Sequence, residues 1–167
     1  MRVAIFVDAA NMFKAQQRMK WHIDYKKILQ YFAKGKDLTE HFFFTGTPYF
    51  KEPEKIGAYR RYRKFLIHAG YTVVEKETKE VRDRDTGKRK RISDLDVHIV
   101  MYMMNYANRY DELVLLSGDT DFVPVLEHLR NTGKEITCVA EEPGALDLRN
   151  VSDRFVGLNS IRKKIEK

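Results

Sequence analysis

Two apolar segments of the sequence each run directly into aspartate. The stretch "IFVDAAN" reaches Asp8 and carries Asn11 three residues later, and "LVLLSGDTDF" ends on Asp119 and Asp121. Hard cations such as Mg²⁺ and Mn²⁺ take oxygen ligands and keep several waters, so a few carboxylates can hold them. Neither segment contains histidine or cysteine, which argues against a zinc site. A cation held this way polarises a phosphoryl oxygen and lowers the pKa of a bound water, so the pattern indicates phosphodiester hydrolysis.

Further carboxylates precede another apolar segment, "SDLDVHIV", which offers Asp94 and Asp96. Each acid has an alternative role, because aspartate is a favoured helix N-cap and Ser93 with Asp96 resembles a capping box. Taken together, acids at separate strand-to-helix junctions favour a shared metal site over independent caps. Asn11 could orient a ligand water or a phosphate, or it could cap a turn.

Apolar strands and helices alternate along the chain, and these elements must position the acids. We expect strands at 2–8, 41–48, 71–76, 112–118, 135–142 and 155–158. We expect helices after residue 8 and at 24–35, 53–70, 95–107, 121–133 and near the C-terminus. The alternation predicts one domain over 1–167, an α/β fold with a mostly parallel sheet covered by helices on both faces. Ligands of such sheets bind beyond the carboxyl ends of the strands, so the acids converge if their strands are neighbours. The 95–107 segment is apolar nearly all round and is expected to be buried, with its methionines in the core.

The charge balance favours a polyanionic partner. The 167 residues include 31 Lys and Arg against 24 acids, a net charge of +7 with a pI near 9.4. Nucleic acid is therefore a more natural partner than a membrane surface. The single cysteine, Cys138, cannot form an internal disulfide. Asp8 interrupts any signal-peptide core, and no apolar run approaches the ~20 residues of a membrane helix, so we expect a cytoplasmic protein without a membrane partner.

Basic residues concentrate in "KETKEVRDRDTGKRKR" (76–91), which holds eight Lys or Arg and four acids and is expected to form a hairpin with "DTG" at its tip. Its last four cations lie just before the candidate middle acids and could bind RNA phosphates: Lys88, Arg89, Lys90 and Arg91. The alternative is a solvated hairpin that protects a sheet edge from aggregation. Phe13 and Trp21 could stack on bases, although packing is the more ordinary role for both.

The motifs "IFVDAAN", "DLDV" and "SGDTDF", in this order and spacing, resemble those of the NYN domain family, close to its LabA-like branch, within the PIN-like nuclease superfamily. The resemblance covers nearly the whole chain. It implies a three-layer α/β/α fold, with the charged hairpin as an insertion, and Mg²⁺- or Mn²⁺-dependent cleavage of RNA, chiefly endonucleolytic.

The motifs carry the family's site onto this chain. Asp8 and Asn11 match the first motif, and Asp119 and Asp121 match the last. For the middle acid we choose Asp96, because the apolar "VHIV" begins immediately after it, with Asp94 as the alternative. The family often has a Lys-Gly pair before this acid, whereas "RIS" stands there in this chain.

The expected activity is a metal-dependent ribonuclease. Four carboxylates (Asp8, Asp96, Asp119 and Asp121) are its metal ligands, and Asn11 completes the catalytic set. The first alternative is a non-catalytic RNA-binding or regulatory module of the same fold. A phosphotransferase of the dehalogenase type, with Asp8 as nucleophile, is disfavoured because Ala10 stands where a second aspartate would be needed. The subunit number is left open, with a homodimer among the possibilities.

Overall fold

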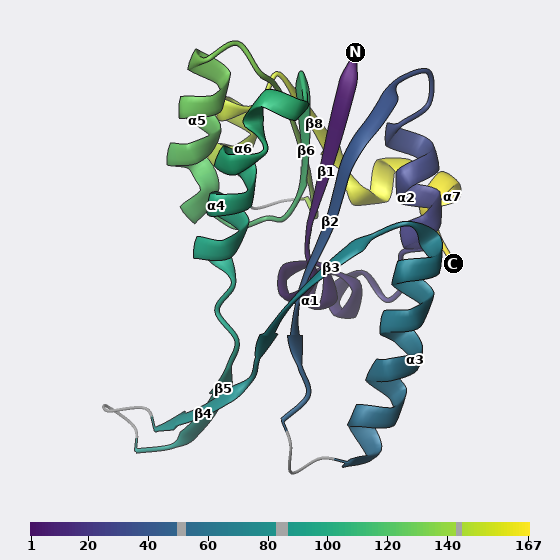
Figure 1. Ribbon diagram of the computed structural model, residues 1–167, viewed down its shortest axis with the longest axis vertical. Helices are drawn as coiled ribbons and strands as arrows, with labels where there is room; N and C mark the ends of the chain where they lie inside the picture. The colour runs from purple at the N-terminus through teal and green to yellow at the C-terminus, as the bar shows by residue number, and fades with distance from the viewer. Residues whose placement is uncertain (50–52, 83–86, 143–144) are drawn as a thin grey trace.

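A six-stranded sheet in the order β3-β2-β1-β6-β7-β8 forms the centre of the structure, a computed structural model. It describes residues 1–49, 53–82, 87–142 and 145–167, and only the backbone of residues 90–92. Every pairing within this sheet is parallel. Helices cover both of its faces (Figure 1), as the three-layer prediction requires.

The strands of the sheet are β1 (Arg2–Asp8), β2 (Asp37–Thr47), β3 (Thr72–Glu77), β6 (Glu112–Leu116), β7 (Glu135–Ala140) and β8 (Arg154–Gly157). The helices are α1 (Ala9–Met19), α2 (Tyr25–Phe32), α3 (Pro53–Ala69), α4 (Asp96–Asn105), α5 (Val123–Asn131), α6 (Leu146–Val151) and α7 (Arg162–Ile165), with 3-10 turns at Ala107–Arg109, Thr120–Phe122 and Leu158–Ile161. The predicted elements are all present, and α6 is an addition that the sequence pattern did not indicate.

Alternation along β1 decides which way Asp8 faces. Side chains of successive strand residues point to opposite faces of a sheet. Val3, Ile5 and Val7 belong to the core cluster shared with α1, α2, α3 and α7. Ala4 and Phe6 belong to the cluster shared with α4, α5 and α6. Asp8 shares the phase of Ala4 and Phe6, so its carboxylate projects toward the α4 side of the sheet.

Helix α4 differs from the prediction in its burial. Ile99 and Met103 are buried against the sheet, but Met101 is 55% exposed and Met104 is 40% exposed. The expectation that this helix is buried all round was therefore wrong. Only one of its faces can contact a single sheet layer, and among the described residues nothing covers its outer face, where Val97 is also exposed.

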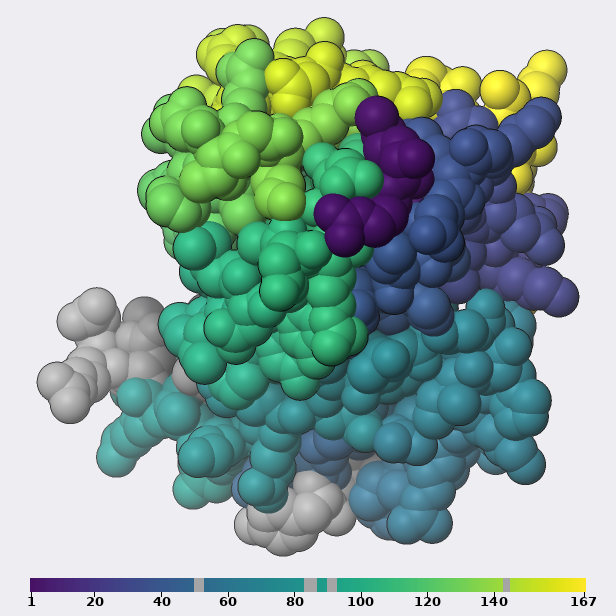
Figure 2. Space-filling view, turned by 45° about the horizontal axis from the view of Figure 1, so that its top comes forward, coloured from purple at the N-terminus to yellow at the C-terminus, as the bar shows by residue number. Residues whose placement is uncertain are grey.

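The basic segment forms a two-stranded antiparallel hairpin, β4 (Lys79–Arg82) with β5 (Arg89–Ile92). The predicted tip, "DTG", falls mostly on residues 83–86, outside the described part of the chain. The hairpin stands out from the body of the molecule beside α4 (Figure 2). Residues 93–95 join the second strand of the hairpin to α4. The base of the hairpin therefore lies near the end of the sheet at which β1 reaches Asp8 (Figure 1). Over the described residues, no helix is both long and apolar enough to cross a bilayer.

Candidate metal centre

The strand order places the acids at a point of connectivity reversal. From β1 the chain builds β2 and β3 on one side, and later β6, β7 and β8 on the other. Because β1 and β6 are paired in parallel, their carboxyl ends lie side by side. A crevice forms beyond the strand ends at such a switch point, and it is the usual ligand site of open α/β sheets. Asp8 ends β1, and Asp119 follows β6 by three residues.

Asp8 is buried and held by two hydrogen bonds. One carboxylate oxygen accepts the backbone N–H of Asn11 at 3.1 Å, and the other accepts the hydroxyl of Ser117 at 2.9 Å. Burial raises the pKa of Asp8, the hydrogen bonds lower it, and the charge of Asp119 raises it further. Each carboxylate oxygen has two lone pairs, so both keep capacity for a cation. Asp8 is therefore a fixed acceptor and also the N-cap of α1.

Ser117 connects Asp8 to the second acidic segment. It is fully buried, and its hydroxyl oxygen also accepts the backbone N–H of Asp119 at 3.1 Å. The sequence reasoning did not assign this serine a role. The available indication was its position after β6, where it lies on the same face as Leu113 and Leu115 and hence toward the α4 side.

Asn11 ties helix α1 to the loop after β6. Its side-chain oxygen accepts the N–H of Gly118 at 2.8 Å. A Cβ on Gly118 would lie 3.3 Å from that oxygen, so glycine allows the close approach. The structure thus gives Asn11 a positioning contact within the protein. Its contact with a water or phosphate remains a prediction.

Asp96, Asp119 and Asp121 form a compact cluster. One carboxylate oxygen from each lies within 4.8 Å of the others. Burial and the charges of Asp94, Asp119, Asp8 and Asp121 raise the pKa of Asp96 from 3.8 to about 6. The carboxylates of the cluster therefore repel one another when they are ionised. Asp8 is not one of the three clustered residues, but its charge reaches Asp96.

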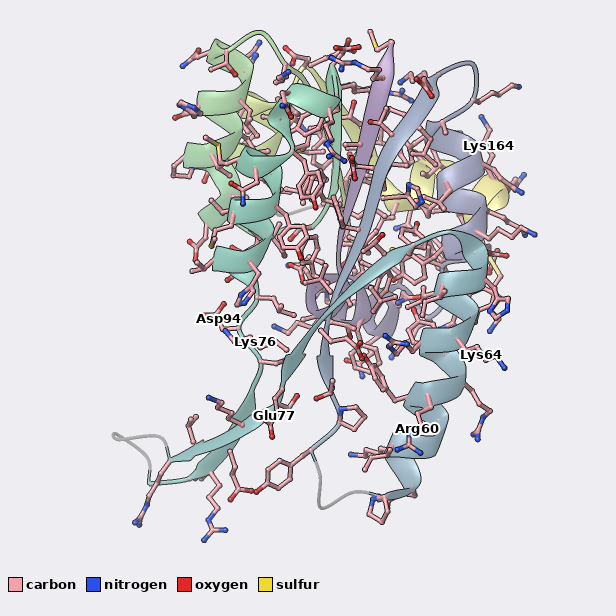
Figure 3. All side chains as sticks on the ribbon, in the orientation of Figure 1. Arg60, Lys64, Lys76, Glu77, Asp94 and Lys164 are labelled. Carbon is pink, nitrogen blue, oxygen red and sulfur yellow. The ribbon has the colours of Figure 1, made fainter. Side chains whose placement is uncertain are left out.

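Asp94, the alternative middle acid, is placed outside the cluster. Its exposed carboxylate accepts the backbone N–H of Asp96, the first residue of α4, at 3.1 Å. Its carbonyl oxygen accepts the Lys76 ammonium, and the two residues lie together at the base of the hairpin (Figure 3). The geometry therefore favours Asp96 over Asp94 as a member of the candidate centre.

Over the described residues, no lysine or arginine forms an ion pair with Asp8 or with the clustered aspartates. Other acids at the same sheet edge do form ion pairs: after β7, Glu141 pairs with Arg18 and Glu142 pairs with Arg149. Carboxylates gathered without a cationic side chain are a suitable donor set for a hard divalent ion. The residues present thus fit Mg²⁺ or Mn²⁺.

The predicted RNA contacts are only partly described. Arg89 is exposed and forms an ion pair with Glu80 at 3.1 Å across the hairpin, and Lys88 is exposed. The side chains of Lys90 and Arg91 lie outside the described part of the structure. Trp21 is buried and donates its indole N–H to Asn159, so it packs in the core. Phe13, by contrast, is 61% exposed.

Comparison with known proteins agrees with this architecture. A crystal structure of a protein of unknown function from Vibrio parahaemolyticus superimposes with a TM-score of 0.76 over 99% of this chain and 96% of that one. Its sequence is 21% identical, so the match shows the fold alone. The low amplitude and bright protein LabA of Synechococcus elongatus is 41% identical over 170 residues, covering 99% of this chain and 88% of LabA.

The family model of the NYN domain matches residues 2–159. This range contains every acid of the candidate centre and the basic hairpin. The chain therefore belongs to the NYN domain family, and its similarity to LabA agrees with the LabA-like branch.

Proposed function

We propose that this protein is a ribonuclease that hydrolyses RNA phosphodiesters within the strand rather than at its ends, with Mg²⁺ or Mn²⁺ held by carboxylates. The observation that carries the proposal is the cluster of Asp96, Asp119 and Asp121 at the switch point, without a neutralising side chain among the described residues. The family, which is related to nucleases, and the net charge of +7 support RNA as the partner.

Different side chains of the protein would bind the cation and position its ligands. Asp96, Asp119 and Asp121 would hold the cation, and Asp8 would complete the set from β1. When bound, the cation supplies Lewis-acid stabilisation of a phosphoryl oxygen and acidifies a water. Ser117 and Asn11 would keep Asp8 and the 117–119 loop in register, because both bridge β1 or α1 to the segment after β6. Because Asp8 is buried, few water molecules would compete with the cation for its carboxylate.

Single-turnover cleavage of labelled single-stranded RNA tests this function. With enzyme in excess, we expect cleavage in Mn²⁺ and none in EDTA, with activity restored when Mn²⁺ is returned. Internal fragments would support an endonuclease. If RNA binds in Mn²⁺ but stays intact under every condition, the non-catalytic RNA-binding module is the better description.

The hairpin is proposed to position RNA by contacting phosphates. We expect the double substitution of Lys88 and Arg89 by alanine to weaken RNA binding similarly for different sequences. Each lost phosphate contact lowers the salt dependence, the slope of log K against log salt, by about 0.7 for a single strand. Two lost contacts should therefore reduce the slope by about 1.4.

A matched control removes the same charge elsewhere. Arg60 and Lys64 are exposed on α3 (Figure 3), and their double alanine variant should leave the slope nearly unchanged. Equal losses in the two variants would mean that the hairpin contributes only general positive charge.

A further inference from the structure

A pocket lies at the same end of the sheet as the acidic cluster, on the opposite face. It is an open pocket of about 590 Å³, within the ~300–1,000 Å³ typical of small-ligand sites. Its lining residues belong to α1, α2, β2, α3, the base of the hairpin and the C-terminal end of the chain. None of the four candidate metal ligands lines it.

The pocket and the candidate metal centre adjoin along the chain and across the sheet. Ala9 and Ala10 line the pocket and directly follow Asp8. Ser93 lines it and stands three residues before Asp96. An RNA strand bound across this edge of the sheet could contact both the pocket and the candidate metal centre.

The lining combines aromatic rings with small polar groups. Phe13 is 61% exposed and Tyr62 is 39% exposed, although both are large rings that would ordinarily be packed. Tyr62 is itself held edge-on against Phe43, with ring centroids 6.1 Å apart. Exposed rings supported by buried ones are suited to stacking on a flat ligand.

Hydroxyl groups are gathered at the end of β2 by a glycine. A Cβ on Gly46 would lie 2.0 Å from the Ser93 hydroxyl oxygen and 3.0 Å from that of Thr78. Glycine therefore allows both hydroxyls to lie against the strand, and Thr45 and His22 also line the pocket. Hydroxyl and imidazole groups can donate or accept hydrogen bonds, as the edge of a nucleobase requires. The described lining includes one lysine, Lys167, and no arginine, so it suits a base better than a phosphate.

We propose that this pocket receives one unpaired nucleobase of the RNA strand whose phosphodiester lies at the acidic cluster. The inference rests on the proposed ribonuclease function and extends it to the substrate class, which is single-stranded RNA. A base within a duplex is already stacked and paired, and it would have to be extruded to enter.

The test is the affinity of a fluorescein-labelled 12-nucleotide RNA, measured by anisotropy in Mn²⁺ with Asp119→Asn in every protein to prevent cleavage. Adding Phe13→Ala should weaken binding of the single strand about tenfold, because one stacking partner is lost. Phe13→Tyr keeps a ring and should restore affinity to within about twofold of the parent. Met101→Ala removes a comparably exposed apolar side chain from α4, outside the pocket, and should have no effect. Binding of the same sequence as a duplex should not respond to Phe13→Ala.

A second measurement locates the base directly. The same RNA carrying 4-thiouridine should, after irradiation, crosslink to peptides that contain Phe13 or Tyr62. The pocket assignment is overturned if Phe13→Ala binds the single strand as tightly as the parent, if it weakens single strand and duplex equally, or if crosslinks map only outside the pocket. If any of these results is obtained while the wild-type protein still cleaves RNA, the pocket inference alone is refuted. Loss of all RNA binding and cleavage by the wild-type protein refutes the ribonuclease proposal as well.

Discussion

Replacing Asp119 by asparagine should lower single-turnover RNA cleavage by about 1,000-fold. A metal ion contributes several kcal/mol of charge stabilisation, and each ~1.4 kcal/mol corresponds to a factor of ten in rate. Asparagine keeps a side-chain oxygen, so it can still accept the N–H of Asp121 as aspartate does at 2.9 Å. The variant should therefore fold normally and still bind RNA, and rapid-quench assays in Mn²⁺ measure the loss.

The control is Asp147→Asn, the same chemical change on the exposed first turn of α6. Asp147 is not part of the cluster, and its variant should cleave at the wild-type rate. Comparable cleavage by Asp119→Asn and wild type would mean that the clustered carboxylates are not the catalytic centre.

Replacing Asp96 by asparagine should stabilise the metal-free protein and weaken its stabilisation by Mn²⁺. The pKa of Asp96 is raised to about 6 in the folded state, so folding favours its protonated form. Its contribution to stability is complete below the ordinary value of 3.8 and is lost as the pH rises through about 6. Above that range the metal-free wild type carries a charge that folding disfavours.

The expected size follows from the same shift. Taken in full, a change from 3.8 to about 6 corresponds to ~3 kcal/mol, but Asp96 is partly exposed and solvent screens it, so we expect about 1 kcal/mol at pH 7.5. Urea unfolding in EDTA should show the variant more stable at pH 7.5 and equal to wild type near pH 3.5.

Saturating Mn²⁺ should reverse the order at pH 7.5, because a cation that binds only the folded state adds stability. Asp94→Asn is the matched control, since Asp94 lies outside the cluster, and it should keep most of the Mn²⁺ response. The account of the cluster fails if Mn²⁺ stabilises Asp96→Asn and wild type equally.

Much of the fold could be predicted because local and long-range preferences agree. The run Val3–Val7 is apolar on both faces, which is the pattern of a strand buried between helix layers. Pro53 and Gly70 bound α3 as predicted, with Gly70 at a positive φ of 115°. Helix α6 was missed because it has only six residues, too few for a periodic pattern.

The burial of α4 was mispredicted because composition does not state how many layers cover a helix. Val97, Met101 and Met104 are apolar yet exposed. The residues of α4 that pack on the sheet side are the buried Ile99 and Met103 and the partly buried Val100 and Tyr102. An apolar sequence predicts burial only where the fold supplies a second contact surface.

The site could be predicted in outline but not in its connections. Asp8 and Asp119 follow strands, and the sequence predicts that they meet if those strands are neighbours, as β1 and β6 are. The choice of Asp96 over Asp94 depends on how far α4 rotates its first turn toward the sheet, which no spacing rule fixes. Ser117 was missed because a single buried serine has no pattern, and its role exists only through its bonds to Asp8 and Asp119.

The most direct measurement of the central claim is anomalous diffraction from crystals soaked in Mn²⁺. The account predicts an anomalous peak among the carboxylate oxygens of Asp96, Asp119 and Asp121, with metal–oxygen distances of about 2.1 Å, as expected for a small hard divalent cation. A fully loaded crystal with manganese elsewhere and none among these oxygens would contradict it.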